Sequence, residues 1–215
     1  MQKIDQDKIV ILDFGSQYTQ LIARRIREIG VLSEIVSSEI APKELLNLNP
    51  KGIIFSGGPE SVNSKFKPKF NSKILTINLP ILGICYGMQL LASEYKGKVD
   101  LSAKREFGHS ELLFNKNILF KGVNSKNTMI DVWMSHGDKV VKLPKRFKKI
   151  ASSTNSKIAA FASNDGQRFG VQFHPEVSHT NQGQKILSNF VLEICGCEKN
   201  WTSKNIIDDL VRSIK

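Results

Sequence analysis

ILGICYGMQLL, at residues 81–91, joins a short apolar run to a G-x-C-x-G turn and then to a second apolar stretch. The run at 81–84 is typical of a buried strand, and the residues from Tyr86 to Tyr95 have the spacing of a helix. Glycine at positions 83 and 87 lets the chain turn sharply without a Cβ clash. This strand–turn–helix pattern is the thiol form of the nucleophile elbow, so Cys85 is a candidate nucleophile.

Cys85 would lie at the N-terminus of that helix, where the partial positive charge of the helix favours a thiolate. The alternative is a small buried cysteine that only serves tight packing between strand and helix. A thiol nucleophile also needs a base and a group that orients the base.

The same alternation of strands and helices precedes this stretch. We predict strands at 8–13, 33–37 and 52–56, and helices at 18–29, with Gly30 as the C-terminal cap, and at 42–48. The pattern then changes to mostly short strands from 112 to 173, followed by helices at 184–194 and 201–214. We therefore expect one α/β domain over residues 1–215, with an open, mostly parallel or mixed sheet flanked by helices.

The bulk composition is that of a globular protein. The chain has 215 residues, 40% of them hydrophobic and 24% charged, which excludes a disordered, collagen-like or membrane-embedded chain. Its net charge of +11 suggests nucleic-acid binding. The basic residues are spread out, however, which favours a solvated surface, with an anionic partner as the alternative.

The cellular compartment that we expect is based on the absence of membrane-spanning, signal and disulfide patterns in the sequence. No apolar run approaches the length of a membrane span, and the first ten residues lack a signal pattern. The three cysteines, Cys85, Cys195 and Cys197, fit neither a disulfide framework nor a zinc site. We therefore expect no metal site and a reducing, cytoplasmic location.

In the segment FHPE at 173–176, His174 is followed at strand spacing by the acidic residue Glu176. Residues i and i+2 of an extended segment point the same way, so Glu176 would hold the Nδ1–H of His174. The Nε2 of His174 would then face Cys85, although only the fold can bring together residues so far apart in the chain.

Acyl transfer also needs donors for an oxyanion. SGGP at 56–59 follows a predicted strand, so the N–H of Gly58 is one candidate and that of Tyr86 is the second. The alternative for this segment is a plain turn. Gln89 lies on the same helix face as Cys85 and could bind a substrate amide. The segment Ser135–Gly137 could present backbone groups to a substrate.

Three of these motifs together resemble the class I, triad-type glutamine amidotransferases: PILGICYGMQLL at 80–91, SGGP at 56–59 and FHPE at 173–176. Four longer segments are most similar to those members that supply ammonia for the amination of XMP to GMP. They are VILDFGSQYTQLIARRIRE at 10–28, REFGHSEL at 105–112, VWMSHGD at 132–138 and GVQFHPEVSHT at 170–180. The resemblance extends over nearly the whole chain.

The resemblance implies a flavodoxin-like fold and the hydrolysis of L-glutamine to glutamate and ammonia through a γ-glutamyl thioester. It implies a role for each of nine residues. These are Cys85 as nucleophile, His174 as base, Glu176 as its orienting acid, the Gly58 and Tyr86 amides as the oxyanion hole, and Gln89, Ser135, His136 and Gly137 around the bound glutamine. No metal or cofactor is expected in this domain.

The resemblance also implies a partner. In the family, ammonia passes to an ATP-pyrophosphatase domain that uses ATP and Mg²⁺. The sequence has no S-G-G-x-D-S loop of that domain. We expect it outside this chain, fused in a longer protein rather than in a separate subunit, and docked near residues 63–73 and 178–182. A dimer of the complete enzyme fits this picture, and neither nucleic acid nor a membrane is expected as a partner.

Three alternatives stay open. The first is an amidotransferase that serves anthranilate, carbamoyl phosphate or CTP synthesis. The second is a cysteine hydrolase of the same fold that acts on γ-glutamyl compounds or peptides. The third is a basic module that binds nucleic acid without catalysis. The sequence assigns no role to His109, His179, Cys195 or Cys197.

Overall fold

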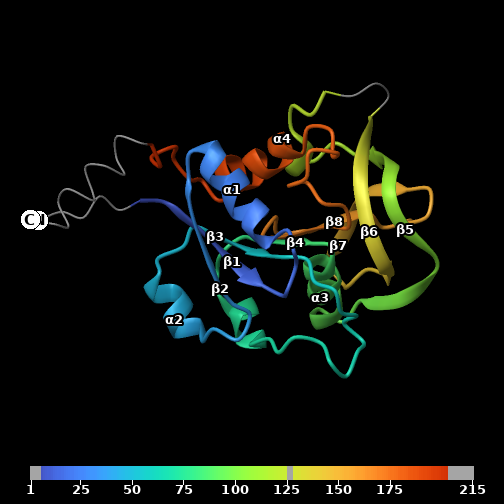
Figure 1. Cartoon of the computed structure of the whole chain (residues 1–215), viewed down its shortest axis with the longest axis horizontal. Helices are drawn as coiled ribbons and strands as arrows, with labels where there is room; N and C mark the ends of the chain where they lie inside the picture. The colour runs from blue at the N-terminus through green and yellow to red at the C-terminus, as the bar shows by residue number, and fades with distance from the viewer. Residues whose placement is uncertain (1–5, 125–127, 203–215) are drawn as a thin grey trace, which may run out of the picture.

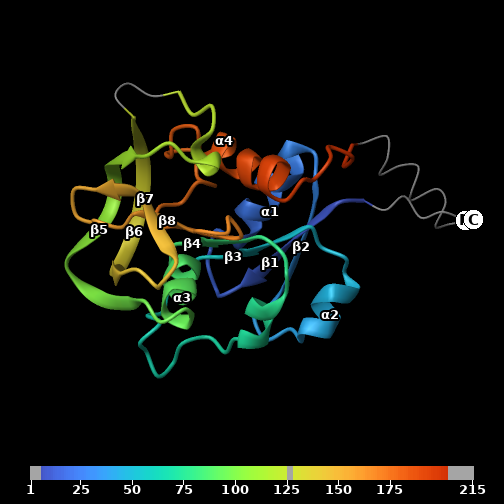
Figure 2. The same cartoon turned by 180° about the vertical axis from the view of Figure 1, so that it is seen from behind.

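Nine strands form one sheet in the computed structural model, which describes residues 6–124 and 128–202 (Figures 1 and 2). Their order across the sheet is β2-β1-β3-β4-β9-β8-β7-β5-β6. The strands are β1 (Lys8–Asp13), β2 (Leu32–Ser37), β3 (Gly52–Phe55), β4 (Ile81–Ile84), β5 (Lys98–Phe114), β6 (Met129–Lys142), β7 (Phe147–Ser153), β8 (Ala160–Ser163) and β9 (Arg168–Val171). The expected α/β fold with a mixed sheet is confirmed.

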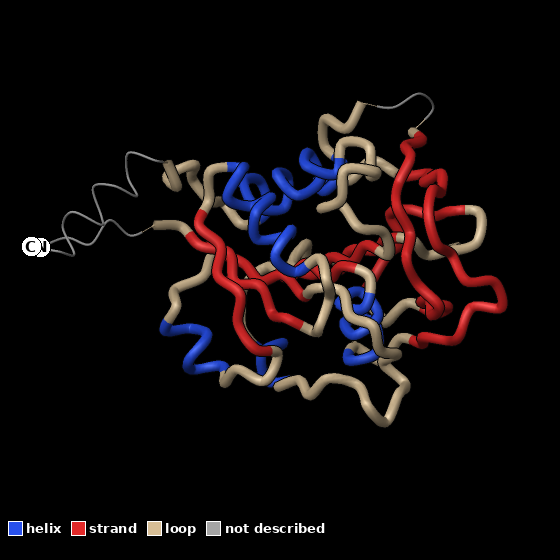
Figure 3. Tube along the Cα trace, viewed as in Figure 1, coloured by secondary structure: helices blue, strands red, loops and turns tan. Residues whose placement is uncertain are grey.

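Helices cover both faces of the sheet, as Figures 1 and 3 show. The α-helices are α1 (Thr19–Ile29), α2 (Pro42–Asn47), α3 (Tyr86–Glu94) and α4 (Gly183–Ser188). The short 3₁₀ turns are η1 (Ser72–Thr76) and η2 (Ile118–Phe120), and η3 (Asn189–Ile194) is a π-helix. The cap expected at Gly30 is confirmed, because this glycine ends α1 in the left-handed conformation with a φ of 98°.

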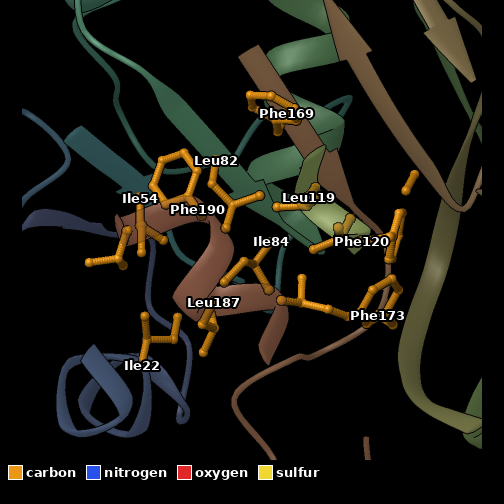
Figure 4. Packing of buried hydrophobic residues seen from close by; sticks show 14 of the residues in the cluster. Ile22, Ile54, Leu82, Ile84, Leu119, Phe120, Phe169, Phe173, Leu187 and Phe190 are labelled. Carbon is orange, nitrogen blue, oxygen red and sulfur yellow. The ribbon is translucent and has the colours of Figure 1, made fainter. Parts of the chain in front are cut away.

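The sheet separates two hydrophobic cores, because successive side chains of a strand point to opposite faces. Ile9 and Ile11 of β1 pack on the side of α1, α4 and η3. Val10 and Leu12 pack on the side of α2, η1 and α3. Figure 4 shows the first core, in which Phe169 and Phe190 bring β9 against η3. This packing fixes the helices on both sides of the parallel strands.

The antiparallel half differs from the expectation of short strands after residue 112. β5 and β6 are 17 and 14 residues long and form one extended hairpin. Along β6, buried and more exposed positions alternate for most of its length, so one face packs on the molecule throughout. The pairing slips between Leu101 and Glu106, and this irregularity interrupts the period-two pattern that would have revealed a long strand in the sequence.

The C-terminal helix predicted at 184–194 is present, but it changes from α to π geometry at Asn189. The Asn189 side chain donates hydrogen bonds to the carbonyls of Leu119 and Lys121. The position at which the helix changes from α to π geometry is therefore bonded to η2 and the residue that follows it. The helix predicted at 201–214 lies outside the described residues, apart from its first two positions. Within the described ranges, no helix is both long and apolar enough to cross a membrane.

A buried arginine, Arg168, binds the start of β9 to η1 and to the segment that follows it. The Arg168 guanidinium donates to the carbonyls of Leu75, Ile77 and Leu79 at 2.8–3.1 Å, and its Nε donates to the Tyr95 hydroxyl at 2.9 Å. The residue is 8% exposed. A buried acceptor that loses its donor costs the full desolvation of that group, so the arrangement depends on the whole guanidinium.

We expect Arg168→Met to lower the free energy of unfolding by about 3 kcal/mol, because it leaves several buried carbonyls without donors. Urea denaturation followed by circular dichroism measures this change. Lys148→Met, on the exposed face of β7, is the control and should change stability by less than about 0.5 kcal/mol. Equal stability of the two variants would contradict this role for Arg168.

Candidate active site

Cys85 lies at a sharp turn between β4 and α3. Its φ of 52° and ψ of −107° are sparsely populated for a residue with a side chain. A Cβ on Gly83 would come within 2.5 Å of the Gly87 main chain, and one on Gly87 within 2.4 Å of the Phe55 carbonyl oxygen. The turn therefore needs glycine on both sides of Cys85, which agrees with the elbow inferred from the sequence.

His174 follows β9, the strand next to β4, and lies close to Cys85. β4 pairs in parallel with β9, and the Cys85 N–H donates to the Val171 carbonyl at 2.8 Å. Three residues further along the chain, the His174 Nδ1 lies 2.7 Å from the Glu176 Oε1. The structure thus brings together Cys85, His174 and Glu176, which the sequence analysis selected as a triad.

The charge state of His174 is set by its two neighbours. Burial by itself lowers the pKa of this imidazole. Hydrogen bonds to Cys85 and Glu176, and the negative charges of both, outweigh burial and raise the pKa well above its usual value. A protonated ring held between Cys85 and Glu176 is suited to donate a proton to a leaving group.

Cys85 faces a cavity of about 560 Å³. Eight of the nine residues expected at the site line this cavity, and the ninth, Glu176, is fully buried behind His174. The eight are Gly58, Cys85, Tyr86, Gln89, Ser135, His136, Gly137 and His174.

The two residues expected to supply the oxyanion donors, Gly58 and Tyr86, lie close together. A Cβ built on Gly58 would be 3.3 Å from the Cγ of Tyr86 and 2.7 Å from the Phe14 carbonyl oxygen. Neither the Gly58 N–H nor the Tyr86 N–H donates a hydrogen bond within the part of the chain that the structure describes. Both donors are therefore available to a bound oxygen atom.

One edge of β6 forms a wall of the site. Main-chain groups of alternate residues point to this edge, which faces away from β5. The Trp133 carbonyl accepts the His174 N–H at 3.0 Å, and two residues later the Ser135 carbonyl oxygen lies 3.5 Å from the Cys85 Sγ. With the same period, Ser135 and Gly137 present their backbone groups to the cavity.

Gln89 lines the cavity, but its amide is partly committed within the protein. The Nε2 donates to the Asp138 carbonyl at 2.8 Å and lies 3.3 Å from the Gln172 Oε1. Gln89 therefore joins α3 to β6, and its NH₂ group is already used in these contacts.

In the β6 wall, a buried imidazole and a buried carboxylate link β6 to β5. The His136 Nε2 lies 3.0 Å from the Glu106 Oε2, and the Nδ1 lies 2.9 Å from the Asp138 carbonyl oxygen. Glu106 also accepts the hydroxyls of Ser156 at 2.8 Å and Ser153 at 3.3 Å. Burial alone raises the pKa of Glu106, but the hydrogen bonds from His136 and the serines and the charge of His136 lower it to about 2.

The sequence analysis missed several residues of the cavity. The loop 15–18 lines it, and the Tyr18 ring contacts the His174 ring edge-to-face at 5.3 Å between centroids. Charged side chains of Glu60, Arg105 and Asp138 also line it. The segment DFGSQYTQ at 13–20 carried the family resemblance, and this was the one available signal that the loop belongs to the site.

The residues without an assigned role lie outside the cavity lining. His109 pairs with Asp131 at the surface at 2.8 Å, and the His179 ring contacts Trp133. Cys195 and Cys197 are buried, and burial raises the pKa of both thiols, that of Cys197 to about 12. In the described residues, no group of three or more His, Cys, Asp or Glu is arranged to hold a metal ion.

The family model "Glutamine amidotransferase class-I" matches residues 10–194. The glutamine-hydrolyzing GMP synthase of Photobacterium profundum is 50% identical over 218 residues, covering 99% of this chain and 41% of that protein. The synthase of the same name from Histophilus somni is 49% identical over 220 residues, covering 100% and 42%. The chain thus spans about two fifths of the length of these relatives.

Two solved structures also match this chain. A protein from Thermoplasma acidophilum, described as a GMP synthase subunit, matches with a TM-score of 0.80 at 32% identity, over 90% of this chain and 96% of that one. A glutamine amidotransferase from Thermotoga maritima matches with a TM-score of 0.65 at 20% identity, over 97% and 96%, and shows likeness of fold. Because the family model spans most of the sequence and the first structure is matched over nearly its whole length, this chain belongs to the class I glutamine amidotransferases.

Proposed function

We propose that this chain hydrolyses L-glutamine to L-glutamate and ammonia, with Cys85 as nucleophile. The observation that supports this most strongly is the convergence of Cys85, His174 and Glu176 at one cavity that also holds two unused backbone N–H donors. A nucleophile, an oriented base and an oxyanion site are the parts that acyl transfer requires.

In the first half of the reaction, the Cys85 thiolate attacks the carboxamide carbon of glutamine. The Gly58 and Tyr86 N–H groups receive the negative oxygen of the tetrahedral intermediate. The C–N bond then breaks while His174 transfers its proton to the departing nitrogen, so that ammonia leaves and a γ-glutamyl thioester remains.

In the second half, His174 accepts a proton from water, and the resulting hydroxide attacks the thioester carbon. The C–S bond breaks, glutamate leaves, and Cys85 returns as a thiolate beside the reprotonated His174. Glu176 stays ionised and keeps the ring of His174 in place during both steps.

The cavity suits a zwitterionic amino acid. Its lining carries the cation of Arg105 and the carboxylates of Glu60 and Asp138, so it offers partners to both an α-carboxylate and an α-ammonium group. The backbone edge at Ser135 and Gly137 adds directional hydrogen bonds, and a site that satisfies both ends of an amide discriminates strongly against analogues.

We further propose that the ammonia serves the synthesis of GMP. The relatives at 49–50% identity are named glutamine-hydrolyzing GMP synthases, and this chain corresponds to about two fifths of their length. The acceptor would be an ATP-pyrophosphatase domain or subunit that uses ATP and Mg²⁺ to activate XMP for amination. Its docking would raise glutamine hydrolysis, since an ungated hydrolase wastes substrate.

Cys85→Ala should reduce glutaminase activity by about 10⁴-fold or more, because it removes the nucleophile itself. Glutamate release from L-glutamine, with and without the synthetase partner, XMP, ATP and Mg²⁺, measures the loss. The variant should keep the melting temperature within a few degrees. A residual rate above one tenth of the wild-type rate would exclude the thioester mechanism.

Glu176→Gln should lower kcat by about 10²-fold, which is less than the effect of Cys85→Ala. The amide keeps an acceptor for the His174 Nδ1–H but loses the charge that stabilises the protonated ring. Steady-state kinetics of both variants in one buffer provide the comparison. Equal residual rates would contradict the orienting role of Glu176.

Glu106→Gln should weaken folding at neutral pH and much less in acid. Folding lowers the pKa of Glu106 from its ordinary value of 4.5 to about 2. The ionised carboxylate therefore stabilises the folded state at pH values above 4.5, and this contribution is lost as the pH falls toward about 2. We expect a deficit of about 2–3 kcal/mol at pH 7 that narrows below pH 4.5. Urea denaturation from pH 3 to 7 measures it.

Glu193→Gln is the matched control for this prediction, because Glu193 pairs with Lys121 at the surface. Its effect on stability should be small at every pH, as for most exposed pairs. A deficit of Glu106→Gln that stays constant from pH 7 to pH 3 would show that its charge does not support the β6 wall.

A further inference from the structure

We propose that Thr180 is a positioning residue for His174, whose main chain it holds against β6 through its buried side-chain hydroxyl. The proposal rests on the function proposed above, in which His174 exchanges protons with the substrate and with water. Nothing in the sequence motifs assigns a role to this threonine, which lies six residues after His174 and is 4% exposed.

The Thr180 hydroxyl links the main chains of Trp133 and His174, which are joined directly by only one hydrogen bond. The His174 N–H donates directly to the Trp133 carbonyl at 3.0 Å. The reverse bond, from the Trp133 N–H to the His174 carbonyl, is replaced by a relay. Trp133 N–H donates to the Thr180 Oγ1 at 3.0 Å, and that hydroxyl donates to the His174 carbonyl at 2.6 Å.

A hydroxyl is suited to this position because it accepts and donates at the same time. Here each of its two functions is used by a main-chain group. A side chain of the same shape without the hydroxyl would leave one buried donor and one buried acceptor unpaired, which costs more than the loss of a single average hydrogen bond. His174 would then be held to β6 by one bond instead of a closed ring of three.

Other contacts of the same loop explain how Thr180 comes to lie under His174. The Thr180 N–H donates to the Val177 carbonyl at 3.2 Å, which closes a turn, and the Asn181 N–H donates to the Asp131 carbonyl at 2.8 Å. The loop therefore runs back along β6, and the Thr180 hydroxyl lies between the main chains of Trp133 and His174. On the opposite side, the Arg25 Nε of α1 holds the Glu176 carbonyl at 2.8 Å.

The expected effect is on the chemical steps rather than on glutamine binding. Thr180 does not line the cavity around Cys85, whereas the residue it holds does. A shift of about 1 Å in a reacting group costs roughly 10²-fold in rate. We therefore expect loss of the hydroxyl to lower kcat and to leave KM nearly unchanged.

The test compares Thr180→Val, which removes the hydroxyl but keeps the shape, with Thr180→Ser, which keeps the hydroxyl. We expect Thr180→Val to lower kcat for glutamine hydrolysis by about 10- to 100-fold with KM within twofold, and Thr180→Ser to stay within about threefold of wild type. Both are assayed in the 215-residue chain alone and with the synthetase partner.

Ser33→Ala controls for the loss of a buried hydroxyl as such. The Ser33 Oγ donates to the Ala23 carbonyl at 2.9 Å between β2 and α1, outside the cavity lining. This variant should lower the melting temperature and keep kcat. If Thr180→Val is not folded at the assay temperature, Thr180→Ala carries the same prediction.

Three results would overturn the proposal: a kcat unchanged in Thr180→Val, equal losses in the valine and serine variants, or failure of both hydroxyl-free variants to fold. The last would assign the hydroxyl to folding. These results can be distinguished from a failure of the proposed function. Full activity of Cys85→Ala would refute the thioester mechanism, whereas a dead Cys85→Ala with an unaffected Thr180→Val would refute only the role of Thr180.

Discussion

The site depends on the parallel pairing of β4 with β9. Gly83 lies beside Gly170 in this pair, and neither position tolerates a side chain: a Cβ on Gly170 would come within 2.7 Å of both Phe161 and Met88. α3 can therefore pack closely on the two strands. Because parallel strands end at the same edge of a sheet, the cysteine that follows β4 and the histidine that follows β9 emerge side by side.

Each of two walls of the cavity contains a buried histidine beside a buried glutamate. On one wall the His174 imidazole lies between a cysteine and Glu176, and on the other the His136 imidazole lies between Glu106 and a main-chain carbonyl. Each ring is buried and has a glutamate carboxylate within 3.0 Å of one of its nitrogens. A buried charge without partners is costly, so these arrangements also restrict the positions that the two rings can adopt.

Local pattern was enough to find most of the site. The G-x-C-x-G turn, the acid two residues after His174 and the SGGP turn can each be recognised from a few consecutive residues, because the chemistry of those residues suggests a role in the site. Eight of the nine selected residues line one cavity. The loop at 15–18 and the Glu106–His136 pair could not be found in this way, because their relation to the site is made by contacts between segments far apart in the chain.

The alternation of strands and helices, the glycines that permit the elbow and the candidate catalytic groups could all be predicted from the sequence, because they follow from spacing and side-chain chemistry. Three features could be seen only in the folded chain: β4 and β9 are neighbours, β5 and β6 form a long hairpin, and Thr180 contacts His174. Strand order and contacts between distant segments result from packing of the whole chain, and no local segment contains that information.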